Sequence, residues 1–60
     1  MTDEDMRLTI ESAAAHVSAA LGRDVVTSVF AMFRASGVDG LDPDDYEAAY
    51  SEFARLEQDI

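Results

Sequence analysis

The fold is constrained most by a pattern of apolar residues three and four positions apart, which recurs in three segments of a 60-residue chain. This spacing places apolar side chains on one face of an α-helix. Gly22 and Gly37 follow the first two segments, where a residue that readily takes positive φ ends a helix, and Asp24 and Asp42 follow as candidate N-caps. The sequence therefore predicts an all-α fold, a compact three-helix bundle with helices at about 3–21, 25–36 and 43–58.

A chain of this length buries only about 60% of the surface that its unfolded form exposes, so we expect one domain, spanning residues 1–60. The first and third segments each present one apolar stripe, formed by Met6, Ile10, Ala13, Ala14, Val17 and Leu21 and by Tyr46, Ala49, Tyr50, Phe53, Leu56 and Ile60. The middle segment is apolar around nearly half its circumference, through Val25, Val26, Val29, Phe30, Met32 and Phe33. This breadth predicts a central helix covered on two sides, in which Phe33→Ala costs about 3 to 5 kcal/mol. Val38 and Leu41 are expected to close the end of the core.

Composition excludes several classes of function. The chain has no Lys, four Arg and thirteen Asp plus Glu, which give a formal net charge of −9. Nucleic acids and anionic membranes are therefore improbable partners, because both bind proteins through basic residues. The sequence contains no apolar run long enough to span a membrane, and the acidic stretch 2–5 is unlike a secretory signal. We expect a cytoplasmic protein.

The inventory for catalysis is small. The chain lacks cysteine and has a single histidine, His16, which helical periodicity places on the border of the first stripe near Ser12 and Ala20. No phosphate-binding, dinucleotide-binding, nucleophile-elbow or zinc-protease motif occurs in the sequence. We therefore expect a protein that is not an enzyme and that uses no cofactor or metal.

The strongest local feature is an acidic segment that joins the second and third helices. Five carboxylates occur within nine residues, namely Asp39, Asp42, Asp44, Asp45 and Glu47. One interpretation is structural: Asp42 caps the third helix, Asp45 completes a pair resembling a capping box, and Asp44 and Glu47 face the positive helix end. A second is a calcium loop, but with Gly40 at position 6 of an EF-hand, positions 1, 3, 5 and 12 hold only one carboxylate, that of Asp39.

A third interpretation is a recognition surface, in which these carboxylates, joined by Glu52 and Asp59 further along the third helix, imitate phosphates towards the Arg and Lys side chains of a basic protein. Acids at positions 3–5 extend this surface if the fold brings them near. In size and charge the chain resembles, as a class, small acidic proteins of phages and mobile elements that block nucleic-acid-handling enzymes, including anti-restriction and anti-CRISPR inhibitors. This resemblance implies a non-enzymatic inhibitor that acts as a nucleic-acid mimic; no sequence motif carries it.

An alternative function is assembly. Leu8, Ala15 and Ala19 share the side of the first helix opposite to its core stripe, and small residues allow another helix to approach closely. In this alternative the face packs against a second copy or a larger subunit, and the acids only solvate the exterior.

Overall fold

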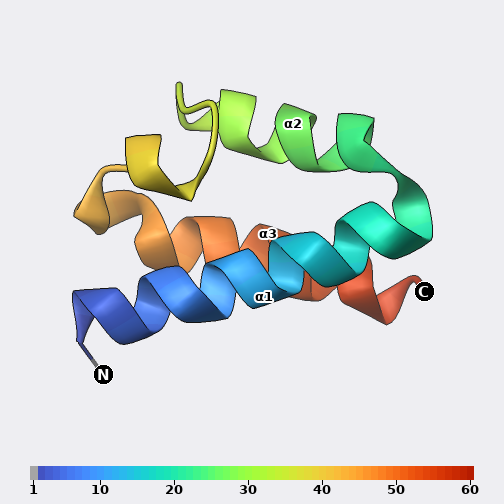
Figure 1. The fold of residues 1–60 in the computed structure, drawn as a ribbon, viewed down its shortest axis with the longest axis horizontal. Helices are drawn as coiled ribbons and strands as arrows, with labels where there is room; N and C mark the ends of the chain where they lie inside the picture. The colour runs from blue at the N-terminus through green and yellow to red at the C-terminus, as the bar shows by residue number, and fades with distance from the viewer. Residues whose placement is uncertain (1) are drawn as a thin grey trace.

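The computed structural model describes residues 2–60 and contains three α-helices, α1 (Asp3–Leu21), α2 (Arg23–Met32) and α3 (Tyr46–Gln58). Two short 3-10 turns, η1 (Val38–Gly40) and η2 (Pro43–Asp45), connect α2 to α3, and no strand occurs in residues 2–60. Helices α1 and α3 lie side by side and run in the same direction, while α2 runs in the opposite direction (Figure 1). The predicted all-α three-helix fold is confirmed.

Side-chain caps begin α1 and the 3-10 turn η2, which leads into α3. The Thr2 hydroxyl accepts a hydrogen bond of 3.1 Å from the Asp5 amide at the start of α1. The Asp42 carboxylate accepts one of 3.0 Å from the Asp44 amide, so Asp42 is an N-cap as predicted, but of η2; α3 follows at Tyr46, and its own N-cap, Asp45, makes no side-chain capping bond. The predicted cap by Asp24 is wrong: α2 begins at Arg23, so Asp24 already lies in its first turn.

The helix ends agree with the sequence at one glycine and differ at the other. Gly22, with φ 105°, is the only residue between α1 and α2 and permits the sharp reversal, as predicted. Gly37 does not end α2, because its φ of −179° is ordinary extended backbone. The helix ends earlier, in a Schellman motif in which Arg34 takes the left-handed conformation (φ 59°) and the Ala35 amide donates to the Phe30 carbonyl.

The early end of α2 frees the following residues to fold back over the core. Val38 and Leu41 are both buried in the connection, which confirms their predicted role as plugs. The centre of the core is nevertheless the contact between α1 and α3, and the four fully buried side chains Ile10, Val17, Ala49 and Phe53 all come from these two helices. The prediction that α2 is the central helix is therefore wrong.

Helix α2 joins this core through one stripe, in which Phe30 packs edge-on against Phe53 with ring centroids 5.3 Å apart. Met32 lies outside the stripe and is 63% exposed, contrary to its predicted burial. Leu21, Tyr50 and Ile60 were also predicted in the core but are exposed; Leu21 and Ile60 lie at chain reversals or ends, where no neighbouring helix covers them.

None of the helices in residues 2–60 combines the length and apolar character needed to cross a bilayer.

Candidate functional site

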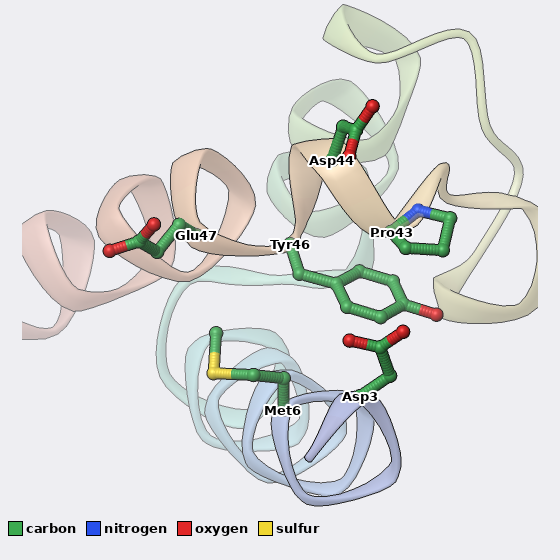
Figure 2. A pocket seen from close by; sticks show the side chains of 6 residues that line it. All are labelled: Asp3, Met6, Pro43, Asp44, Tyr46 and Glu47. Atoms are coloured by element: carbon green, nitrogen blue, oxygen red, sulfur yellow. The ribbon is translucent and has the colours of Figure 1, made fainter. Parts of the chain in front are cut away.

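The parallel course of α1 and α3 brings the first turns of both helices to the same end of the molecule (Figure 1). Between them lies an open hollow of about 480 Å³, shown in Figure 2. Its lining comes from the start of α1, from η2 and from the start of α3, and consists of Asp3, Met6, Pro43, Asp44, Tyr46 and Glu47. Segments forty residues apart in the sequence thus build one surface.

The hollow combines an apolar floor with an acidic rim. Met6 is half-buried and Tyr46 is buried, whereas Asp3, Asp44 and Glu47 are exposed. In Figure 2 the Tyr46 ring extends from the start of α3 towards Asp3 on α1, while Asp44 and Glu47 point outwards on the α3 side. The surface therefore offers both apolar contact area and negative charge to a ligand.

The negative charge of the acids at this end of the molecule exceeds the positive charge of the two helix dipoles. Six carboxylates lie in the first turn of α1, in η2 or in the first turn of α3: Asp3, Glu4, Asp5, Asp44, Asp45 and Glu47. The aligned peptide dipoles of a helix are equivalent to about half a positive charge at its N-terminus, so two adjacent N-termini supply about one. Most of the negative charge at this end is therefore not neutralised by the helix dipoles.

Acids at positions 3–5 were expected to join the recognition surface only if the fold brought them near, and the structure places Asp3 in the same hollow as Asp44 and Glu47. The sequence could not identify Met6 and Tyr46 as floor residues, because their spacing assigns both only to core stripes. The sequence does show that two predicted helices each begin with acidic residues. These two acidic helix starts form one surface when the helices run in parallel.

Two of the acids predicted to bind a partner already have basic neighbours within the chain. Asp39 in η1 forms an ion pair with Arg7 of α1, and Glu52 forms an ion pair with Arg55 one turn later in α3. The hydrogen bond that Arg7 donates to the Asp39 carboxylate raises the pKa of Arg7 above its ordinary value, and the charge interaction with Tyr46 raises this pKa further. The acidic segment has no basic neighbour in the sequence, and Arg7 becomes a neighbour of Asp39 only in the folded chain.

The remaining acids of the predicted segment serve different roles. Asp42 is the cap described above, and Asp45 is half-buried at the start of α3. The Asp45 side chain accepts no capping hydrogen bond from residues 2–60, so the predicted capping-box pair with Asp42 is not formed. Asp44 and Glu47 have no ion-pair partner among the described residues and remain available to a ligand.

A second hollow, of about 320 Å³, lies between α1 and α3 and is lined by Thr9, Ser12, Ala13, His16, Tyr50 and Glu57. His16 Nδ1 lies 2.9 Å from Glu57 Oε2, so the histidine has a partner on α3 that the sequence did not reveal. Ser12 is one helical turn from His16, but no hydrogen bond joins their side chains in the part of the chain described. The backbone amides in the middle of α1 donate their hydrogen bonds within the helix, so they are not available to stabilise an oxyanion beside Ser12 and His16.

No group of three or more His, Asp and Glu side chains within residues 2–60 is arranged to hold a metal ion. Comparisons with models of protein families, with curated proteins and with solved structures found no match for this chain.

Proposed function

We propose that this protein is a non-enzymatic binding module whose acidic hollow docks on the basic surface of another protein. The observation that carries this proposal is that Asp3 of α1, Asp44 of η2 and Glu47 of α3 line one hollow with an apolar floor. None of these three carboxylates forms an ion pair with a described residue. A basic partner gains both charge pairing and apolar contact there.

The class of partner that fits best is a protein that handles nucleic acids. Such proteins carry basic surfaces shaped for rows of phosphates, and a surface with a strong negative field attracts them over long range. Carboxylates fixed on the first turns of two packed helices hold their spacing better than carboxylates on a flexible loop. Occupation of the basic surface excludes nucleic acid from it, so we further propose an inhibitory role by phosphate mimicry.

The proposal is tested by affinity capture at low salt from host extract with three proteins. These are the wild type, a hollow variant (D3N, D44N and E47Q), and a control variant (E11Q, D24N and D59N) with the same loss of charge. The control positions are exposed and lie outside the hollow. We expect the wild type and the control variant to capture the same basic protein, and the hollow variant to lose it.

Equal capture by all three proteins would contradict the proposal, because it would mean that the hollow plays no part in binding. Equal loss with both variants would also contradict it, since total charge and not the arrangement in the hollow would then govern capture. Nucleic acid added in excess is expected to displace the captured protein if the two compete for one basic surface.

A second candidate function is self-assembly through α1, and one observation favours it. Leu8 is 58% exposed, and Ala15 and Ala19 are also exposed on the same side of the helix, away from the core. A small core gains stability when an apolar face is covered by a second copy. We propose this face, Leu8, Ala15 and Ala19, as the contact of a homodimer that leaves the acidic hollow open.

Sedimentation equilibrium at micromolar concentrations tests this second candidate. We expect a concentration-dependent dimer for the wild type and a monomer for Leu8→Glu, because a buried carboxylate without a partner is strongly unfavourable at an apolar contact. Leu8 is exposed in the single chain, so the substitution should leave the far-ultraviolet helical signal unchanged. A monomeric wild type, or a dimer that Leu8→Glu does not disturb, would exclude this face as the contact.

A further inference from the structure

The side chain that distinguishes the hollow from an ordinary acidic helix start is Tyr46. This residue is only 7% exposed, yet it lines the hollow. Its hydroxyl makes no hydrogen bond within residues 2–60, and no fully buried polar atom there lacks a partner. The hydroxyl is therefore accessible from the hollow, as Figure 2 shows by its direction towards Asp3. A buried tyrosine normally gives its hydroxyl a partner, so this group is open to a ligand.

The chemistry around the hydroxyl fits a guanidinium group. The Asp3 carboxylate and the Tyr46 hydroxyl both accept hydrogen bonds, and they come from different helices at one end of the hollow. A guanidinium has five N–H donors in a planar fork and meets several acceptors at once, whereas an ammonium is a compact and strongly hydrated charge. Met6 and Pro43 line the same hollow and offer apolar contact to the aliphatic part of an arginine side chain.

The arginine nearest to the hollow in the sequence is engaged elsewhere. Arg7 lies one helical turn after Asp3, a spacing at which the two side chains can pair on a helix. In the structure Arg7 instead forms its ion pair with Asp39 of η1. This long-range pair leaves Asp3 without an ion-pair partner among the described residues, although Arg7 also interacts electrostatically with Tyr46. Asp3 therefore remains available to a cation from outside the chain.

We infer that the hollow between the first turns of α1 and α3 is a pocket for an arginine side chain of a separate basic protein. This inference rests on the proposed function and adds to it the identity of the anchoring residue. The guanidinium lies between Asp3 and the Tyr46 hydroxyl, and its stem packs against Met6 and Pro43. Asp44 and Glu47 supply the surrounding negative field.

The experiment uses two synthetic peptides of equal length and charge, one with alternating Gly and Arg and one with alternating Gly and Lys. Each is titrated into ¹⁵N-labelled protein at low salt, and amide shift changes report both the affinity and the site. We expect the arginine peptide to shift residues around Asp3, Met6 and Tyr46 and to bind more tightly than the lysine peptide. Tyr46→Phe should weaken binding of the arginine peptide about three- to tenfold, as expected for the loss of one hydrogen bond in a hollow that is open to solvent.

Tyr46→Phe keeps the buried ring, so the fold is expected to persist, and unchanged amide shifts in α2 check this. The lysine peptide serves as the matched control and should bind Tyr46→Phe and wild type equally. A second pair, Asp3→Asn against Asp59→Asn, removes one exposed carboxylate inside or outside the hollow; only Asp3→Asn should weaken the arginine peptide.

Two outcomes would overturn the arginine pocket. If both peptides bind the hollow with equal affinity and Tyr46→Phe affects neither, the acidic docking surface stands but the arginine specificity does not. If neither peptide shifts residues of the hollow, the proposed function fails as well. If Asp3→Asn instead converts a dimer of the free protein into a monomer, the occupant is an arginine of a second copy and the inference of a separate partner is wrong.

Discussion

Phe53→Ala is expected to destabilise the domain by about 3 to 5 kcal/mol, because it removes a large, fully buried side chain and leaves a cavity. Phe53 has no exposed surface, and its ring contacts Phe30 of α2 edge-on, so it links the packed pair α1 and α3 to α2. A domain of this size has a total stability of only about 3 to 9 kcal/mol. We therefore expect the variant to be largely unfolded, as measured by far-ultraviolet circular dichroism during thermal and urea denaturation.

Two substitutions in α2 and at its end provide a graded comparison. Phe33 is only partly buried, so Phe33→Ala should cost about 1 to 2 kcal/mol. This cost is less than the roughly 3 to 5 kcal/mol that the sequence predicts for a buried Phe33. Met32 is mostly exposed, so Met32→Ala should change the free energy of unfolding by less than about 0.5 kcal/mol. A Phe53→Ala protein that melts as cooperatively as wild type within a few degrees would show that the core is not centred on α1 and α3.

The second large effect concerns the kinetics of binding. With a purified basic partner, the hollow variant (D3N, D44N and E47Q) should associate about tenfold more slowly than wild type, or slower still, because the electrostatic attraction that steers encounter is weakened. Dissociation should change less, and the wild-type association rate should fall as salt rises past about 0.15 M, where the screening length is roughly 8 Å. Stopped-flow or surface-plasmon-resonance measurements at two salt concentrations give both rates.

The control variant (E11Q, D24N and D59N) removes the same number of charges from outside the hollow and should associate nearly as fast as wild type. In the hollow variant, loss of the helix-dipole interaction opposes relief of like-charge repulsion, so its helical signal should remain close to that of wild type. If both variants slowed association equally, the overall charge of the chain, and not the hollow, would steer the encounter.

Local and periodic features were readable from the sequence. The three apolar stripes, the reversal at Gly22, the cap at Asp42 and the plugs Val38 and Leu41 follow from helical geometry and from interactions within a few residues. Such features depend on backbone preference and on side chains one turn apart, which the order of residues specifies directly. The exposure of Leu8, Ala15 and Ala19 could be predicted for the same reason.

Only the tertiary structure decided how these helices are arranged and therefore where the acids meet. An apolar stripe shows that a helix is covered but not by which neighbour, so the sequence placed α2 at the centre where the structure places the contact of α1 with α3. Helix α2 ends at Met32, and the turn that follows takes its left-handed conformation at Arg34 and not at Gly37, which a local glycine rule does not include. The partners of Arg7 and His16 lie 32 and 41 residues away. The acidic hollow arises because α1 and α3 are parallel, and that direction is set by the packing of all three helices and by the connection between α2 and α3.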